Sequence, residues 1–435
     1  MKRRLTVLAA AAALATLGLT ACSSSGGGSS PGSTAANTGG GGGGGSSSSS
    51  APVTLKLLGA DYGSGPSNTT QKYWQNIADA FHKANPSITV DVNTINWTDY
   101  DTKVKAQIQN HEFPDILQGE FFPQYVNDNL LAPVTDIVSD PNLGQATFKN
   151  QFSVKGTQYA LPFTTSARAL FYNKQLFAKA HISSPPQTWA ELESDAKKLK
   201  SAGVEIPYAL PLGPEEAQAE SFLWMLGNNG GWQNAQGKYD INSPQNIQTF
   251  EFLKKLVSEG LTNPTPATYN RTADSAADFA AGKVGMEFNG PFLTQTISAA
   301  GKLKTSDYAT SAVPGKNGPL NKTLGVADAI QVFKSSDSNK MAAIKTFMDY
   351  AMNNKNQLDF AKEYALLPGT QSAADTLKND PVLGAFIKAL PNTVTFPTDE
   401  NWTATVLPAI KQTIGTAVTG DPKSVLDALQ AKAES

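Results

Sequence analysis

Two adjacent carboxylates, Glu215 and Glu216, are the residues in this sequence whose chemistry first raises the question of catalysis. A pair of carboxyl groups can act as acid and base on opposite sides of a glycosidic bond. Neighbours in an extended chain point to opposite sides, so these two cannot flank one bond. His82, His111 and His181 lack metal-ligand spacing, and the sequence has neither a phosphate-binding glycine loop nor a Gly-x-Ser-x-Gly turn. We therefore expect no catalytic residue, no metal, no cofactor and no enzymatic activity.

Cys22 is the one cysteine of the chain, and its position favours covalent modification. Basic residues precede an apolar segment, residues 5–19, which is followed by Thr20-Ala21-Cys22. This order is typical of a lipoprotein signal peptide, residues 1–21, whose removal exposes a thiol for lipidation. The alternative, an ordinary secretory signal, leaves a lone cysteine without a use, because it cannot form an intramolecular disulfide.

Residues 22–51 are expected to form a flexible tether, since 22 of the 28 residues from 23 to 50 are Gly or Ser. About 385 residues follow, more than one hydrophobic core usually contains, so we expect two lobes. Without the signal peptide the chain has 32 basic and 37 acidic residues. This negative balance argues against nucleic acid as a partner.

Strands and helices are expected to alternate from residue 53 onward. Residues 53–58 and 87–95 have the alternating or β-branched pattern of strands, and apolar residues recur at helical spacing across 73–84. We expect Asp99 to cap a helix that runs to residue 110, and residues 114–117 to open a third strand. Such alternation predicts a parallel sheet covered by helices.

The second half of the chain continues in the same way. Thr188 and Glu191 have the spacing of a capping box, and Ser243-Pro244 marks another helix start. We expect residues 274–281 to be helical and 284–288 to form a strand. The predicted fold class is α/β, with ligand bound where strand ends meet between two lobes.

Several segments are specific enough to compare with known families. They are Phe81-His82-Lys83-Ala84-Asn85-Pro86-Ser87-Ile88-Thr89-Val90, Phe113-Pro114-Asp115-Ile116, Tyr159-Ala160-Leu161-Pro162-Phe163, Leu170-Phe171-Tyr172-Asn173-Lys174 and Gly282-Lys283-Val284-Gly285-Met286-Glu287-Phe288-Asn289-Gly290-Pro291-Phe292. In this order and spacing they resemble the extracellular solute-binding proteins of the maltose-binding type, which serve carbohydrate ABC importers. The resemblance runs from about residue 53 to the last residues of the sequence.

This resemblance implies a two-lobe, periplasmic-binding-protein-like fold, in which each lobe is a sheet flanked by helices and the ligand cleft lies at the hinge. The chain would cross between the lobes more than once. We expect residues 52–165 and about 326–378 in the N-terminal lobe, and about 166–325 and 379–435 in the C-terminal lobe. A bound solute would bridge the lobes and close them.

Polar candidates for the site come from the loops that the resemblance marks as ligand-contacting. A sugar has apolar ring faces and a rim of hydroxyl groups, so it needs aromatic surfaces together with charged or amide groups. The polar candidates are Asp61, Tyr62, Gln118, Glu120, Ser166, Arg168, Glu215 and Asp328. Structural alternatives are a helix cap for Asp61, a solvated charge for Glu120 and an ion pair for Arg168. We prefer Glu215 over Glu216 as the carboxylate that faces the ligand.

The aromatic candidates are Trp97, Trp232, Phe292 and Trp402. The resemblance puts a sugar-stacking aromatic residue, usually Trp, at Phe292 and the last stacking Trp at Trp402. The smaller ring of Phe292 leaves the number of sugar rings open. Core packing is the alternative for both, and Trp97 can instead pack on the helix that follows it. Trp232 is left open, whereas Trp224 is expected in the core.

The resemblance implies a monomeric receptor that hands a carbohydrate to the transmembrane subunits of an ABC permease. Lipid at Cys22 would hold it on the extracellular face of the cytoplasmic membrane of a Gram-positive-type bacterium. One alternative is a receptor for another polar solute, such as a polyol or phosphodiester, and a site without stacking aromatics would favour it. Another is a secreted glycoside hydrolase or cell-wall enzyme, which two acidic side chains about 5 to 10 Å apart would favour.

Replacing Cys22 by Ala should abolish the membrane anchor, because no thiol remains to accept lipid. We expect Cys22→Ala to incorporate no labelled fatty acid and to be released into the medium or retained as the precursor, with Ser23→Ala as the matched control. Labelling and membrane association that persist in Cys22→Ala would show that the lipidation hypothesis is wrong.

Overall fold

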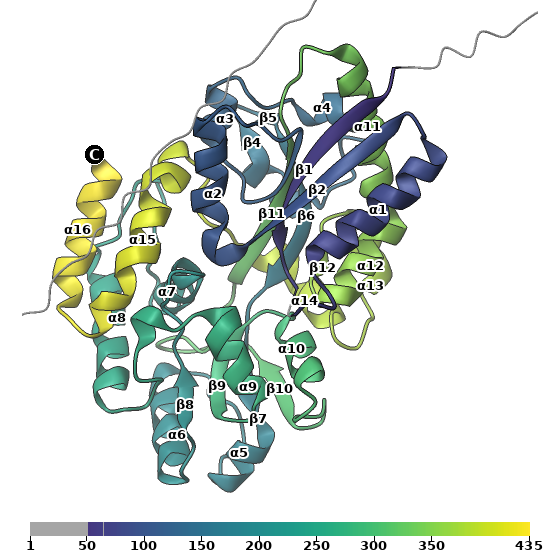
Figure 1. Ribbon diagram of the computed structural model, residues 1–435. Coiled ribbons are helices and arrows are strands. Elements are labelled where there is room, and N and C mark those ends of the chain that lie inside the picture. Colours follow the sequence, from purple (N-terminus) through teal and green to yellow (C-terminus); the bar gives the residue numbers. More distant parts are fainter. Residues whose placement is uncertain (1–50, 64) are drawn as a thin grey trace, which may run out of the picture. The chain divides into compact units, whose positions relative to one another are not determined.

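The computed structural model describes residues 51–63 and 65–435. The predicted signal peptide, Cys22 and the tether up to residue 50 lie outside the described residues. The described residues form one compact unit that contains a seven-stranded and a four-stranded sheet, both with helices packed on them (Figure 1). We call the part built on the seven-stranded sheet the first lobe and the part built on the four-stranded sheet the second lobe. The prediction of an α/β fold is confirmed.

The first lobe's sheet has the strand order β12-β6-β11-β3-β1-β2, and β13 pairs with β11 beside this path. Its strands are β1 (Val53–Asp61), β2 (Ile88–Asn96), β3 (Ile116–Gly119), β6 (Ala160–Ala167), β11 (Thr323–Val332), β12 (Leu367–Pro368) and β13 (Thr393–Val394). Strand β1 is parallel to β2 and β3, as the alternation predicted. Strand β11 is antiparallel to β3 and β6, so the sheet is mixed and not fully parallel.

Apolar side chains hold helices against this sheet. Helices α1 (Thr70–Ala84), α11 (Ser338–Ala351) and α12 (Asn354–Tyr364) contribute Trp74, Phe347 and Phe360 to a core shared with β1 and β11. Burying a large apolar side chain contributes about 1.5 to 3 kcal/mol, so these contacts are the main source of the lobe's stability.

Helix α2 (Trp97–Gln109) begins two residues before the predicted cap, Asp99. The observed N-cap is Asn96, whose side-chain oxygen accepts a hydrogen bond from the Asp99 backbone N–H at 3.0 Å. Both residue types can cap a helix, and Asn96 takes the role because β2 ends there. Asp99 lies instead in the first turn, where a negative charge is favourable.

The second lobe's sheet has the order β10-β7-β9-β8. Its strands are β7 (Ala169–Asn173), β8 (Ile206–Ala209), β9 (Val284–Asn289) and β10 (Tyr308–Ser311). Thr188 forms the predicted capping box for α6 (Trp189–Ser201), and Ser243 caps α8 (Pro244–Ser258) as predicted. Trp224 of α7 (Ala217–Leu226) is fully buried, which confirms its predicted place in the core.

Shorter elements complete the described chain. A π-helical turn, Arg271–Ala276, precedes α9 (Ala277–Ala280), so the helix predicted from residue 274 begins earlier and with a different geometry. The others are α3 (Pro123–Asn127), α4 (Val134–Ile137), β4 (Ser153–Val154), β5 (Thr157–Gln158), α5 (Lys174–Lys179), α10 (Leu293–Ala300), α13 (Gln371–Leu377), α14 (Gly384–Ala389), a π-helical turn Trp402–Val406, α15 (Leu407–Thr413) and α16 (Pro422–Glu434), with short 3₁₀ turns between some of them. None of the helices described is long and apolar enough to span a membrane.

Three segments cross between the lobes side by side. Arg168 is the single residue between β6 of the first sheet and β7 of the second. Its N–H donates to the Leu324 carbonyl at 3.1 Å, and its own carbonyl accepts from the Thr323 hydroxyl at 2.8 Å. Strand β13 pairs in parallel with the start of β11, opposite Thr323. We infer that these hydrogen-bonded crossing segments form the hinge between the lobes. The residue ranges predicted for each lobe stay a prediction.

Side chains also connect the lobes away from the hinge. Helix α15 packs with the second lobe's core, and its Lys411 Nζ lies 2.9 Å from the Asp101 carboxylate of α2 in the first lobe. Lys105, also on α2, donates to the Thr403 carbonyl at 3.0 Å. These bonds hold α2 beside the C-terminal segment in this arrangement.

Gly325 allows β13 to approach β11 at the hinge. A Cβ added to Gly325 would lie 2.4 Å from Thr393 Oγ1 and 2.7 Å from Thr393 Cβ. We expect Gly325→Ala to lower the free energy of unfolding by about 1 to 3 kcal/mol, the usual cost of overpacking, as measured by urea denaturation.

The matched control is Gly318→Ala, because nothing lies within 4 Å of a Cβ added there. The double variant Gly325→Ala/Thr393→Gly should recover part of the lost free energy of unfolding, because it lacks the Thr393 side chain that the new methyl group meets. Equal stability of the Gly325→Ala and Gly318→Ala proteins would contradict the close approach of β13.

Candidate functional site

Tyr62, Gln118 and Asp328 form a hydrogen-bonded group at one edge of the first lobe's sheet. Gln118 Nε2 donates to Tyr62 Oη at 2.7 Å, and Tyr62 Oη donates to Asp328 Oδ2 at 2.9 Å. Tyr62 follows β1, Gln118 lies in β3 and Asp328 lies in β11. The parallel strands β1 and β3 bring their carboxyl ends to the same edge, which is the usual place for a ligand in such sheets. Three residues singled out in the sequence are therefore in direct contact.

Asp61 and Trp97 flank this group in different ways. Asp61 Oδ1 accepts hydrogen bonds from the backbone N–H groups of Gly63 at 3.0 Å and Thr70 at 2.8 Å. Asp61 thus stabilises the turn into α1, which is the structural alternative considered for it. The Trp97 ring meets the Tyr62 ring edge-on, with ring centroids 5.4 Å apart. Trp97 therefore lies beside the polar group, at the start of α2.

Arg168 extends the site toward the second lobe. Its Nη1 donates to Ser166 Oγ at 2.8 Å, and its Nη2 forms an ion pair with Glu216. The guanidinium carbon lies 5.3 Å from the centre of the Phe292 ring, within the range of a cation–π contact. Arg168 is 4% exposed, and its Nε is a buried donor with no hydrogen-bond partner among the described residues.

Gly290 makes room for this arrangement. A Cβ added at Gly290 would lie 2.7 Å from Arg168 Nη1 and 2.6 Å from the Phe292 ring. The turn is fixed by Asn289, whose side chain accepts from the Gly290 N–H at 2.8 Å and donates to the Glu287 carboxylate at 2.7 Å.

Glu216 pairs with Arg168, whereas the preferred candidate, Glu215, bonds to the turn before α9. Glu215 Oε2 accepts a hydrogen bond from the Thr272 backbone N–H at 3.0 Å. Glu216 lies at the N-terminal end of α7 and pairs with Arg168 through one carboxylate oxygen and with Arg271 through the other. Burial by itself raises the pKa of Glu216, but the two guanidinium groups outweigh it and leave the pKa lowered.

Arg271 and Glu220 continue the ion pairs into the second lobe. Arg271 Nη2 lies 2.8 Å from Glu220 Oε2, and the side chains of both residues are at most 1% exposed. The other Glu220 oxygen accepts from Tyr208 at 2.6 Å and from Trp224 at 2.8 Å. Sequence reasoning missed this series, because neither Arg271 nor Glu220 lies in a motif or in a loop after a predicted strand.

Two carboxyl groups of the site have pKa values near neutrality. Burial raises the pKa of Asp328 to about 7, with a smaller contribution from Glu216. Burial, and next the charge of Asp101, raise the pKa of Glu120 to about 8. Near neutral pH such groups can both donate and accept hydrogen bonds, which suits a ligand with hydroxyl groups.

Lys411 lies among carboxylates of both lobes. Burial lowers its pKa, but Asp101, Glu120 and Glu216 raise it more strongly, so the net shift is upward. Lys411 therefore remains charged and balances part of the negative charge between the lobes.

Trp402 and Trp232 belong to an aromatic cluster in the second lobe. Trp402 is 2% exposed and Trp232 is fully buried. The Trp402 ring stacks on Phe396 with centroids 5.7 Å apart, and lies 5.7 Å from the Trp232 ring. Protein covers these rings in this arrangement, and stacking of Trp402 on a sugar stays a prediction.

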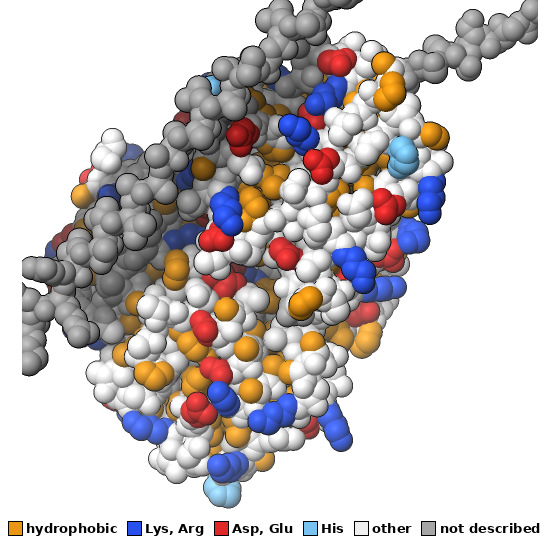
Figure 2. Space-filling view, viewed as in Figure 1, with side chains coloured by type: hydrophobic (Ala, Val, Ile, Leu, Met, Phe, Trp, Pro, Cys, Tyr) orange, Lys and Arg blue, Asp and Glu red, His pale blue; other side chains and the backbone are white. Residues whose placement is uncertain are grey.

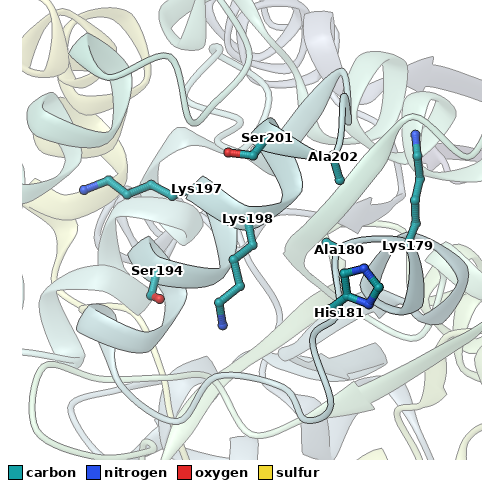
Figure 3. Close-up of a pocket in the computed structure, with 8 residues that line it drawn as sticks. All are labelled: Lys179, Ala180, His181, Ser194, Lys197, Lys198, Ser201 and Ala202. Carbon is teal, nitrogen blue, oxygen red and sulfur yellow. The ribbon is translucent and has the colours of Figure 1, made fainter.

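A basic surface hollow between α5 and α6 lies apart from these residues and contains none of the predicted site residues (Figure 3). Two of its lysines are already paired, Lys197 with Glu193 and Glu259, and Lys198 with Asp195. In the described part of the chain, no group of three or more His, Cys, Asp or Glu side chains could hold a metal ion. On the face drawn in Figure 2, acidic and basic side chains are interspersed.

Two α/β lobes joined by several crossings, with polar and aromatic groups gathered where they meet, define a two-lobed binding protein. Residues 76–392 match the model of the bacterial extracellular solute-binding proteins. A binding protein of Brucella abortus (strain 2308) is 30% identical over 382 residues, which cover 85% of this chain and 90% of that protein. The chain belongs to the bacterial extracellular solute-binding protein family, which confirms the resemblance noted in its sequence.

Other similar proteins have named ligands. The sn-glycerol-3-phosphate-binding periplasmic protein UgpB of Brucella melitensis is 28% identical over 242 residues, 52% of each chain. An ABC transporter solute-binding protein from Thermotoga lettingae, solved with alpha-D-tagatose, has a TM-score of 0.76 at 20% identity and covers 87% of this chain and 98% of its own. A sugar transporter protein from Arthrobacter chlorophenolicus, solved with laminaribiose, has a TM-score of 0.76 at 21% identity, with coverages of 88% and 99%. These structures share the two-lobe fold.

The raised pKa of Asp328 predicts a measurable effect of pH on stability. Its folded-state pKa, about 7, lies above the unfolded value, so the folded protein binds more protons between about pH 4 and 7. Stability contributed by protonated Asp328 is present below that window and is lost as the pH rises through it. In this window the free energy of unfolding should fall by up to about 1.4 kcal/mol per pH unit because of Asp328, and Asp328→Asn should abolish that part of the fall. The measurement is urea unfolding at several pH values.

Asp375→Asn is the control, because the hydrogen bond and charge of Lys378 lower the pKa of Asp375 and move its titration below this window. If the wild type and Asp328→Asn show parallel stability curves from pH 4 to 7, the raised pKa is wrong.

Proposed function

We propose that this protein is the substrate-binding component of an ABC importer and that it binds a neutral carbohydrate between its two lobes. The observation that carries the proposal is Arg168, which contacts the Phe292 ring and has a buried, unpartnered Nε donor in the described structure. An aromatic surface beside a charged donor is complementary to a sugar's apolar faces and hydroxyl rim. Gln118 Oε1 is a second buried polar atom, an acceptor, without a partner among the described residues.

Charge pairing favours a neutral solute over an anion. In the described structure Arg168 pairs with Glu216 and Lys411 with Asp101, and Lys105, which donates to the Thr403 carbonyl, interacts with the charges of Asp101 and Glu120. Asp328 and Glu120 add carboxyl groups on the first lobe. An anionic ligand would therefore lose its hydration without gaining a free cation.

The names of the similar proteins give two candidate classes of ligand, a sugar and a phosphate ester. Tagatose and laminaribiose, the solutes named for the two structures above, are neutral and rich in hydroxyl groups. The competing candidate is sn-glycerol-3-phosphate, which the name of the partial relative UgpB gives as its ligand. The pairing of Arg168 with Glu216 favours the sugar.

Further parts of the proposal rest on the sequence and on the family. The similar proteins are named for binding, which supports a receptor without enzymatic activity. Lipid on Cys22 would anchor the receptor outside the cytoplasmic membrane, next to the permease, and we propose that it acts there as a monomer. We also propose Trp402 and Trp232 as a second aromatic surface, which a sugar would reach when the lobes open.

Phe292→Ala should weaken sugar binding by about tenfold or more, because a buried aromatic contact contributes on the order of 1 kcal/mol beyond its area. The measurement is calorimetric titration with a panel that includes maltose, laminaribiose and tagatose. The control is Tyr350→Ala, because Tyr350 is a partly buried aromatic residue that contacts Phe81 in the first lobe's core.

Tyr350→Ala should keep the wild-type affinity and lose only stability. After incubation with the protein, chromatography should show that the sugar is unchanged. Wild-type affinity in a folded Phe292→Ala protein would eliminate the Phe292 contact, and protein-dependent hydrolysis products would place the protein among the enzymes.

A further inference from the structure

Glu216 is a carboxylate held between two buried guanidinium groups. One of its oxygens pairs with Arg168 and the other with Arg271, and the side chains of the two arginines are 2% and 1% exposed. The Glu216 side chain is 18% exposed, so it is the member of this trio that is most open to solvent.

The charges of this series cancel in pairs. Arg168, Glu216, Arg271 and Glu220 alternate in sign along a line of ion pairs, and Tyr208 and Trp224 hold Glu220 at its inner end. Arg271 also donates to the Phe288 carbonyl, which fixes it to β9. Because buried charges are stable only when paired, removal of one member leaves a partner with an uncompensated charge.

We propose that Glu216 is the residue that sets the charge preference of the binding site, by neutralising Arg168 and Arg271 and so excluding anionic solutes such as phosphate esters. The proposal rests on the proposed function, because it concerns which solutes the same site accepts. Without the Glu216 carboxylate, two guanidinium groups would converge on one position. Paired guanidinium groups bind phosphate and carboxylate oxygens with strong, directional hydrogen bonds.

The environment of Arg168 offers no second carboxylate in direct contact. Arg168 has Ser166 Oγ as its other hydrogen-bond partner in the described structure, and Asp328 interacts with it only through electrostatic attraction. Arg271 keeps Glu220 when Glu216 is lost. Removal of the Glu216 charge would therefore leave Arg168 as the uncompensated cation nearest to the ligand.

Glu216→Gln keeps the shape of the side chain and removes its charge. We expect Glu216→Gln to bind sn-glycerol-3-phosphate at least about tenfold more tightly than the wild type, and glycerol no more tightly, by calorimetric titration at low ionic strength. The gain should shrink as salt is added, because it is electrostatic. Adding Arg168→Gln to Glu216→Gln should abolish the gain.

Glu193→Gln is the matched control. Glu193 also lies between two cations, Lys197 at 2.5 Å and Lys255 at 2.7 Å, but on the outer surface of α6. The Glu193→Gln substitution changes the net charge of the protein by the same amount as Glu216→Gln. We expect no gain in affinity for sn-glycerol-3-phosphate from this variant.

Glu216→Ala provides a second measurement if Glu216→Gln folds poorly. Alanine leaves space where the carboxylate lay, so acetate added to the buffer should occupy it between the two guanidinium groups. We expect acetate to raise the melting temperature of Glu216→Ala above its effect on the wild type and on Glu193→Gln, with chloride at equal ionic strength as the reference.

The inference is overturned if a folded Glu216→Gln protein gains no affinity for the phosphate ester, or if Glu193→Gln gains as much. If Glu216→Gln does not fold, it is overturned when acetate fails to stabilise Glu216→Ala selectively. Tight binding of sn-glycerol-3-phosphate by the wild type would also overturn it. Failure of the wild type to bind any neutral sugar would instead count against the proposed function, and a gain in Glu216→Gln would still support the charge role of Glu216.

Discussion

The pairing of one carboxylate with two buried guanidinium groups connects the hinge with two separate parts of the second lobe. Arg168 enters from the hinge, Glu216 from the start of α7 and Arg271 from the π-helical turn before α9. Desolvated charges of this kind cost several kcal/mol each unless they are paired and hydrogen-bonded. The backbone positions of the hinge, the helix start and the turn are therefore mutually dependent.

Much of the fold follows from local sequence signals. The strands that begin at Val53 and Ile88, the capping box at Thr188 and the cap at Ser243 were all predictable to within a residue, because each depends on neighbours along the chain. The antiparallel placement of β11 between β3 and β6 was not predictable in the same way. It arises because β11 returns from the second lobe through the hinge, and no local pattern records that route.

In the candidate site, too, local sequence patterns predict some contacts and not others. Tyr62, Gln118 and Asp328 come together because three strands end or pass at one edge of a sheet, which strand order along the chain can indicate. The choice between Glu215 and Glu216 depends on the backbone at the start of α7, and Arg271 is recognisable only once its partners are in place. Long-range charge pairing selects these residues, and a single sequence does not contain that information.

The bonds between α2 and the C-terminal segment have a consequence for kinetics. Lys411 with Asp101, and Lys105 with the Thr403 carbonyl, stabilise the approach of the lobes whether or not a solute lies between them. A receptor whose lobes already attract each other spends part of its time in a form that a solute cannot enter. Its apparent affinity is then the affinity of the open form multiplied by the fraction of time that it is open. In return, the same bonds slow the escape of a captured solute, so the strength of these contacts sets a compromise between fast capture and long retention.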